Sequence, residues 1–493
     1  MPGGRRAITV FGVTAEQRAA RGGPPAGAAP VDPLAVMRSR AYLRLLVLAV
    51  ALGVPIAAAA YWFLKLTELA QQWTFVAAPK ALGFPAAPLW WPLLPLTVSG
   101  LLVGLAIRYL PGRGGESPAE GFHAGGLPLP ATLPGIALAA LASIGLGAVI
   151  GPEGPLVALG GGLAYLAVSL GRRDVPRQTA AVIAATGSFA AISTLLGTPL
   201  AGAFLLMEAS GAGGLLATAV LLPGLLGAGV GALIFTGLDA LTGYGTFSLV
   251  IPDLPKAGAP TLAEFGWAIG IGLIAAVLCS GIRWLAVLIR DSIASRLVPY
   301  TVLLGVIIAG FTILYTSATG HAASDVLFSG QAALPRVVDS RATYTVGALL
   351  LLLACKGIAY LAALGGFRGG PTFPAMFLGA VGGIALSHLP GMPLVAGVAM
   401  GVGAMTAGML RLPMTAVLLA TLLLGSDAFP VIPLVIVAVV VCYVTVLRLS
   451  PGQQAAATPS PQPGAAAPVG AVPPPRQSEP VPDRHPPPPP PDR

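Results

Sequence analysis

Cysteine and histidine are scarce in this sequence, and their scarcity argues against several kinds of chemistry. Only three cysteines occur among 493 residues, widely separated at Cys279, Cys355 and Cys442. They lack metal-ligand spacing, so we expect structural thiols rather than a disulfide or a metal site. The four histidines, which include His123 and His321, are scattered and form no cluster with Asp or Cys of the kind an embedded enzyme needs. We therefore expect no enzyme, no metal and no cofactor.

Charge is also scarce, because only 9% of the residues are charged while 55% are hydrophobic and the mean hydropathy is +0.84. This composition is typical of an integral membrane protein. The apolar stretches are long rather than short and alternating, which predicts helices and not a β-barrel. Many of the 65 glycines and 49 prolines interrupt these stretches. We therefore expect an all-α polytopic protein whose helices are short, broken or tilted, in contact with the lipid bilayer.

The net charge of +9 does not indicate a nucleic-acid partner, because the basic residues lie mostly in tails and loops. Positive charge beside membrane helices instead favours the cytoplasmic side. We expect a plasma membrane of bacterial type with both termini in the cytoplasm. One group of arginines precedes or opens the first apolar segment and another marks a later loop: Arg5, Arg6, Arg18, Arg21, Arg38, Arg40 and Arg44, then Arg172, Arg173 and Arg177.

The two ends of the chain have compositions that cannot bury a core. Residues 1–36 are rich in Gly, Pro, Ala and Arg and lack the apolar core of a signal peptide, so we predict a disordered cytoplasmic arm. Residues 450–493 are rich in Pro, Ala and Gln and predict a disordered tail, with a proline-recognising partner as the alternative. The membrane domain is then 37–449.

Within that domain, apolar segments alternate with turns. Some of them, such as 199–209 and 413–425, are shorter than the roughly 20 residues that cross a bilayer, so they predict partial helices sheltered by neighbours. The segments are 42–75, 89–110, 132–150, 155–170, 178–196, 199–209, 214–238, 262–290, 299–316, 344–365, 374–388, 393–410, 413–425 and 429–448.

Two short patterns occur twice in the same order. Residues 155–160 share the spacing of Pro, Leu and Gly with 374–379, and 198–202 resemble 412–416. A glycine precedes the second pattern at the same distance in each half: Gly187 before Pro199 and Gly401 before Pro413. We predict two inverted-topology repeats, about 40–240 and 260–448, whose broken helix ends meet near the middle of the membrane.

Glu153 is the most informative single residue, because it lies between Gly151-Pro152 and Gly154-Pro155 inside a strongly apolar region. A charge at membrane depth costs several kcal/mol, so such a residue usually lines an aqueous or ion pathway. A helix that begins there directs its unpaired N–H groups and positive dipole end into the pathway. An acid at a site built for anions suggests a gate. The alternative is an ordinary acidic residue that starts a helix.

Four stretches, in this order, resemble the CLC family of chloride channels and chloride/proton antiporters over nearly all of residues 40–448. Gly114–Pro118 lies where the family has Gly-Ser-Gly-Ile-Pro, and Gly151–Pro155 matches Gly-Arg-Glu-Gly-Pro. Gly197–Gly202 resembles the start of the family's subunit-interface helix, and Gly369–Pro374 resembles Gly-x-Phe-x-Pro. The resemblance implies a homodimer with one pore in each subunit.

By the same resemblance, Glu153 is the gating residue, whose carboxylate occupies an anion position when ionised and leaves it when protonated. Ser117 either donates its hydroxyl to the ion or caps a helix. Pro152 replaces the family's arginine and removes a cation beside the gate. The implied anion-binding residues are Ser117, Gly151, Glu153, Gly154, Gly370, Thr372 and Phe373.

Proton coupling is where the sequence departs from the antiporters. Glu208 matches the first of two adjacent carboxylates, while the second, which the resemblance identifies as the internal proton relay, is Ala209. Glu208 is a possible proton-path residue, with a structural role as the alternative. The family's pore tyrosine has no match here, since Tyr443 lies earlier, in an apolar segment. For Lys356 we expect snorkelling or an interface position, with anion attraction or a buried acid partner as alternatives.

These observations favour a glutamate-gated pathway for chloride or a similar small anion, operating as a passive channel. One alternative is a chloride/proton antiporter with a rerouted proton path. A second alternative is an organic-anion permease. Uphill chloride movement driven by a proton gradient would separate the antiporter from the channel.

Overall fold

The computed structural model describes residues 37–449 except 123–125, 172–176, 194, 212–213, 246–250 and 252–254. The predicted arm, the predicted tail, Arg172, Arg173 and His123 lie outside the described residues, and so does the side chain of Arg177. The described part of the chain belongs to one compact unit, which ends at Leu449.

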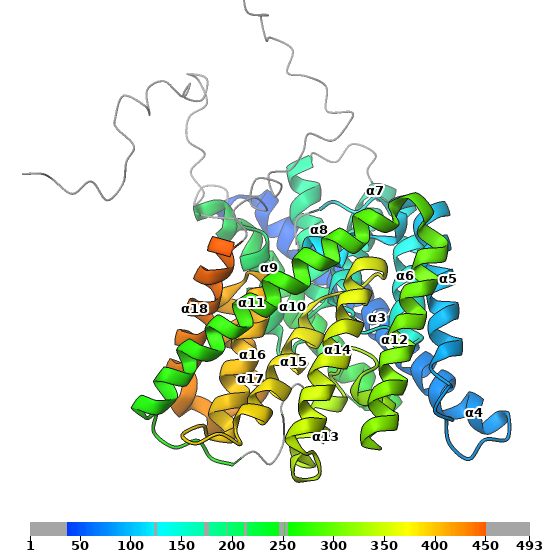
Figure 1. Cartoon of the computed structure of the whole chain (residues 1–493). Coiled ribbons are helices and arrows are strands. Elements are labelled where there is room, and N and C mark those ends of the chain that lie inside the picture. Colours follow the sequence, from blue (N-terminus) through cyan, green and yellow to red (C-terminus); the bar gives the residue numbers. More distant parts are fainter. Residues whose placement is uncertain are drawn as a thin grey trace, which may run out of the picture. The chain divides into compact units, whose positions relative to one another are not determined.

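Regular structure in the described residues is helical, apart from one isolated β-bridge between Gly151 and Gly370 (Figure 1). The α-helices, which keep the labels of Figure 1, are α3 Arg40–Gln72, α4 Ala78–Ala81, α5 Leu93–Tyr109, α6 Leu133–Gly145, α7 Glu153–Gly171, α8 Arg177–Ala191, α9 Pro199–Ala209, α10 Gly214–Thr242, α11 Leu262–Ile293, α12 Leu297–Thr319, α13 Ala333–Asp339, α14 Val346–Gly366, α15 Thr372–Leu386, α16 Leu394–Leu410, α17 Pro413–Leu424 and α18 Ile432–Leu449. The short helical turns are η1 Trp73–Ala77, η2 Pro111–Gly114, η3 Pro118–Glu120, η4 Pro130–Thr132, η5 Ala294–Arg296, η6 Ala323–Asp325, η7 Arg341–Thr343 and η8 Ser426–Val431.

Six helical stretches in the described residues are long and apolar enough to cross a membrane. Others are too short for that. The 11 residues of α9 and the 12 of α17 are each shorter than 20 Å at about 1.5 Å per residue, against a hydrocarbon core of about 30 Å. The prediction of an all-α membrane protein with partial helices is confirmed.

The predicted internal repeat is visible in how the glycines pack. Gly160 of α7 lies against Gly187 of α8, so close that a Cβ on Gly160 would be 2.5 Å from the Gly187 carbonyl oxygen. In the second half, Gly379 of α15 lies against the carbonyl of Gly401 in α16 in the same way. The two glycine pairs picked out by the sequence pattern therefore form equivalent helix crossings, which need small residues for close backbone approach.

We expect Gly379→Ala to destabilise the protein, because its Cβ would overlap backbone atoms of Gly401 that cannot move aside alone. Overpacking of this kind costs about 1–3 kcal/mol. The matched control is Gly382→Ala in the same helix, where nothing lies within 4 Å of the added Cβ. Thermal unfolding in detergent should show a lower midpoint for Gly379→Ala only. Equal midpoints for the two variants would contradict the packing argument.

Two local features differ from the sequence predictions. The segment expected to run to 150 ends as α6 at Gly145, because Gly147 has a left-handed φ of 104° and its missing Cβ leaves room for Phe75. The extended stretch that follows leads to the start of α7. The short helix α13 was not predicted, since its few residues are not a continuous apolar run.

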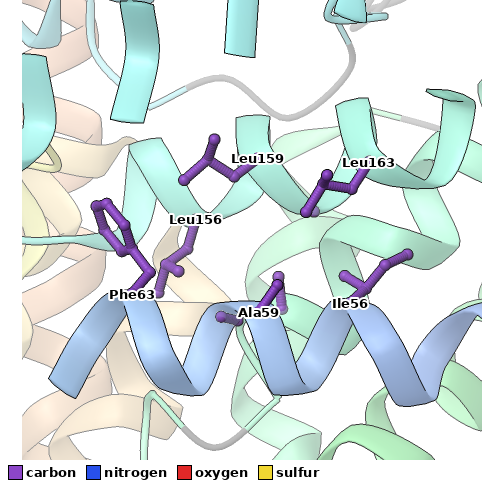
Figure 2. Close-up of a pocket in the computed structure, with 9 residues that line it drawn as sticks. Ile56, Ala59, Phe63, Leu156, Leu159 and Leu163 are labelled. Atoms are coloured by element: carbon purple, nitrogen blue, oxygen red, sulfur yellow. The ribbon is translucent and has the colours of Figure 1, made fainter. Parts of the chain in front are cut away.

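The side of α7 that faces α3 is incompletely packed. A cavity of about 140 Å³ lies there, and Figure 2 shows Leu156, Leu159 and Leu163 of α7 opposite Ile56, Ala59 and Phe63 of α3. Its remaining lining residues, Ala60, Gly160 and Ala191, are also without polar side chains. The helix that begins with Glu153 therefore borders a small apolar space.

Candidate anion site

Glu153 is the first residue of α7, and its side chain is completely buried. One carboxylate oxygen, Oε1, accepts a hydrogen bond from the backbone N–H of Phe373 at 3.1 Å. The other oxygen, Oε2, is buried and has no hydrogen-bond partner among the described residues. An anionic group thus lies at the N-terminus of α15, where unpaired N–H groups and the helix dipole favour negative charge.

Gly151 and Gly370 join the two helix starts. The N–H of Gly151 donates to the carbonyl of Gly370 at 2.8 Å, and the N–H of Gly370 donates back at 2.6 Å. A Cβ on either glycine would overlap the Glu153 carboxylate, so a side chain at either position would displace that carboxylate from the place it occupies here. Gly154 also packs closely, though less so, since its Cβ would lie 3.2 Å from the Gly369 carbonyl oxygen. These glycines fix the N-termini of α7 and α15 beside one carboxylate.

Thr372 and Phe373 begin α15. Both are buried, and the Thr372 hydroxyl has no partner among the described residues. Pro371 has no N–H to donate, but its carbonyl accepts a hydrogen bond from the Tyr360 hydroxyl at 2.7 Å. The structure therefore places six of the seven predicted anion-site residues together: Gly151, Glu153, Gly154, Gly370, Thr372 and Phe373.

Tyr360 is a residue of this region that was not predicted from the sequence. It lies in α14, is fully buried, and is close enough to Glu153 to feel its charge. The available signal was an aromatic hydroxyl in a long apolar run, eleven residues before Pro371. Buried tyrosine hydroxyls usually need a hydrogen-bond partner. Because α14 ends just before the predicted site residues, the partner of a tyrosine in this helix is expected to belong to the site.

Ser117 lies on a separate turn, at the start of η3, which packs against α11 and α14. Its side chain makes no capping hydrogen bond, and its buried hydroxyl has no partner among the described residues. The alternative of an ordinary helix cap is therefore wrong. A buried hydroxyl without a partner is costly, so an unfilled donor at this place calls for a ligand or water.

Glu208 is at the end of α9 and binds the start of α17. Its Oε1 accepts from the Met414 N–H at 3.0 Å, and its Oε2 accepts from the Thr415 N–H at 2.7 Å and hydroxyl at 2.6 Å. The residue before Pro413 is Leu412, which offers no side-chain cap of its own. A carboxylate from the first half of the chain thus caps a helix of the second half.

Lys356 does not snorkel, and that prediction is wrong. Its side chain is completely buried in α14, and the three N–H donors of its Nζ serve four backbone carbonyls at 2.9–3.3 Å, two of which share a proton. It also lies 4.3 Å from the centre of the Phe377 ring. The four carbonyls belong to a single loop, Asp325, Val326, Leu327 and Phe328. Lys356 therefore stabilises a loop whose last residue donates its N–H to Gly147, on the stretch that leads to Glu153.

The carboxylate of Asp325 is buried in the same region. It accepts hydrogen bonds from the hydroxyls of Tyr344 at 2.9 Å and Tyr315 at 3.3 Å, and from Arg336 at 3.4 Å. Burial, followed by the negative charge of Asp325, raises the pKa of Tyr344 to about 12. Tyr344 therefore remains a proton donor at physiological pH, and the cluster is a structural network.

The apolar cavity beside α7 does not suit an anion, because none of its lining side chains can donate a hydrogen bond. The described residues contain no group of three or more His, Cys, Asp or Glu side chains that could hold a metal ion.

Known proteins resemble this chain in sequence. A profile described as voltage gated chloride channel matches residues 99–446. The protein YfeO of Salmonella schwarzengrund, named as a provisional ion-transport protein, is 29% identical over 359 residues, covering 72% of this chain and 84% of its own length. YfeO of Escherichia coli O7:K1 is 29% identical over 365 residues, covering 72% of this chain and 82% of its own.

Solved structures share the fold. The crystal structure of a slow cyanobacterial Cl⁻/H⁺ antiporter superposes with a TM-score of 0.65 at 22% identity, covering 82% of this chain and 95% of that one. A CLC-type fluoride/proton antiporter gives a TM-score of 0.58 at 19% identity, with the same coverage of both chains. The profile match, which spans most of the described residues, shows that this chain belongs to the voltage gated chloride channel family, the CLC family of anion transporters and channels.

Proposed function

We propose that this protein moves chloride, or a similar small anion, across the membrane through a pathway that Glu153 gates. The observation that carries the proposal is the position of the Glu153 carboxylate on the Phe373 N–H at the start of α15. A chloride ion would need the same donors, so the carboxylate and the ion compete for one place. The protein would act as a homodimer with one pathway in each subunit, in a plasma membrane of bacterial type with both termini in the cytoplasm.

Protonation decides the competition. A charged carboxylate is held by the N–H donor and by the positive helix end, whereas a neutral carboxyl group is held much less strongly. The protonated form is favoured at low pH, so the donors become free for an anion as the pH falls. Anion flux should therefore rise with acidification.

Passive movement is better supported than strict proton coupling. Glu208 accepts three hydrogen bonds at the start of α17, which occupies its carboxylate in capping, and its neighbour is Ala209. The alternative, an anion/proton antiporter, is favoured by the two superposed structures, which are of a Cl⁻/H⁺ and a fluoride/proton antiporter. A different proton path would then be required.

Reconstituted vesicles separate the two functions. With equal chloride on both sides, a pH gradient should drive no net chloride movement through a channel, whereas it would drive uphill movement through an antiporter. We expect downhill chloride efflux and no uphill movement. The variant Glu208→Gln should leave the efflux rate unchanged, because that residue serves helix capping. Uphill chloride movement in the wild type would replace the channel by the antiporter, and its loss in Glu208→Gln would assign the proton path to that residue.

A further inference from the structure

A second set of unpaired polar groups lies around η3. Arg283 of α11 is only 7% exposed, and its guanidinium donates to the Met409 carbonyl at 2.7 Å and to the Glu120 carbonyl at 3.4 Å. Its third nitrogen, Nε, is buried, and the single N–H that it carries has no partner among the described residues. Gly121 adjoins the guanidinium so closely that a Cβ there would lie 3.0 Å from it. In Figure 1, α11 runs obliquely past α14 and α16, which its contacts confirm.

The charge of Arg283 is not balanced by a nearby acid. No carboxylate of the described residues lies within 4 Å of its guanidinium. The carboxylate of Glu120 is directed instead to Arg290, at 2.7 Å. Arg411 is near enough for its positive charge to act on Arg283 as well. Backbone carbonyls offer only dipoles, so a buried guanidinium in this setting lacks the counter-ion that buried charges normally have.

The surroundings connect Arg283 to the candidate anion site. The unpaired Ser117 hydroxyl lies at the start of the η3 turn, and the Glu120 carbonyl that Arg283 binds lies at its end. Tyr360, whose hydroxyl binds the Pro371 carbonyl beside Glu153, is close enough to feel the charges of both Glu153 and Arg283. The two groups therefore lie near the same buried tyrosine.

We propose that Arg283 is an anion-binding residue of this protein, whose Nε–H and positive charge hold a small anion beside the η3 turn, on the same pathway as Glu153. The transported anion is then the missing counter-ion. This inference rests on the proposed function. It places a fixed positive charge on α11, whereas Pro152 supplies no positive charge beside Glu153. The anion binds without chemical change, and Arg283 keeps its proton at any physiological pH.

The test uses the full chain in detergent and in vesicles, with potassium chloride as the probe. Replacing the guanidinium in Arg283→Met removes a charged donor, so half-saturating chloride should rise about tenfold or more, both in calorimetric binding and in flux. Arg283→Lys keeps the charge and should restore most of the affinity. The control is Arg341→Met, which removes another arginine bonded to a backbone carbonyl, that of Val338.

A second variant tests the same idea without touching the buried side chain. Glu120 is half exposed, and Glu120→Gln removes its negative charge while leaving its carbonyl on Arg283. Chloride should then bind about two- to threefold more tightly, because an exposed charge acts weakly through solvent.

If Arg283→Met folds and half-saturating chloride is unchanged, Arg283 is only a structural link and the inference is overturned. If Arg283→Met aggregates, unchanged chloride affinity in Glu120→Gln overturns it. The variants could change chloride binding although the wild-type protein shows no chloride flux. That result would support the Arg283 site and count against the proposed transport.

Discussion

Chloride efflux through Glu153→Ala should be fast at neutral pH and almost independent of pH. The wild-type carboxylate occupies the Phe373 N–H when it is charged, and its removal leaves this donor free at every pH. In the wild type, the protonated fraction of a single carboxyl group changes by up to about tenfold per pH unit above its pKa. Efflux should therefore increase as the pH falls in the wild type, and not in the variant. Vesicle efflux from pH 7.5 to 4.5 is the measurement.

Two further variants make that result specific. Glu153→Gln is neutral at all pH values and should also lose pH dependence, even though its amide oxygen can still accept the Phe373 N–H. Glu68→Gln removes a half-exposed acid that pairs with Lys65 on α3, and it should keep the wild-type pH profile. If Glu153→Ala and the wild type show the same pH dependence, another group is the gate.

Lys356→Met should lower the free energy of unfolding by about 3 kcal/mol or more, because three buried carbonyls and one partly buried carbonyl would lose their donor together. Methionine has a similar volume, so the effect reports the lost hydrogen bonds and charge rather than a cavity. The thermal unfolding midpoint in detergent should fall by several degrees or more. Efflux should also decrease, because the loop that Lys356 holds contacts Gly147, on the stretch that leads to Glu153.

The control for Lys356 is Lys80→Met at the exposed end of α4, which should change the midpoint little. A fall in midpoint shared by both variants would indicate a general effect of lost positive charge. An unchanged midpoint in Lys356→Met would mean that water satisfies the loop carbonyls.

Much of the helical arrangement could be predicted from the sequence, because apolar runs and their interruptions are local signals. The bounds of α9 agree with the predicted 199–209, and α17 differs from its segment by one residue. The glycine pairs of the two halves were found for a related reason: a close helix crossing demands a small residue at a fixed place. The candidate gate was found because a lone acid between glycines and prolines is conspicuous in an apolar chain.

Residues whose position depends on partners far along the chain could not be predicted. Lys356 was expected to reach the surface, since nothing in its own segment offers a partner for a buried amine. Its four carbonyls come from a loop about 30 residues earlier. Arg283 was missed for the same reason, because its binding partners lie on η3 and at the end of α16. Local sequence shows that a charge is present, but only the tertiary structure shows what surrounds it.

The hydrogen bond between Glu153 and Phe373 joins residues that are 220 positions apart. The ribosome must therefore deliver α7 to the membrane well before α15 exists, and during that interval the acid has no N–H from Phe373. Because a bare carboxylate is costly in hydrocarbon, the start of α7 should stay near water or a chaperone until the later helices arrive. A nascent chain arrested before residue 373 should then remain accessible to proteases at Glu153, which makes the start of α7 one of the last parts of the molecule to assemble.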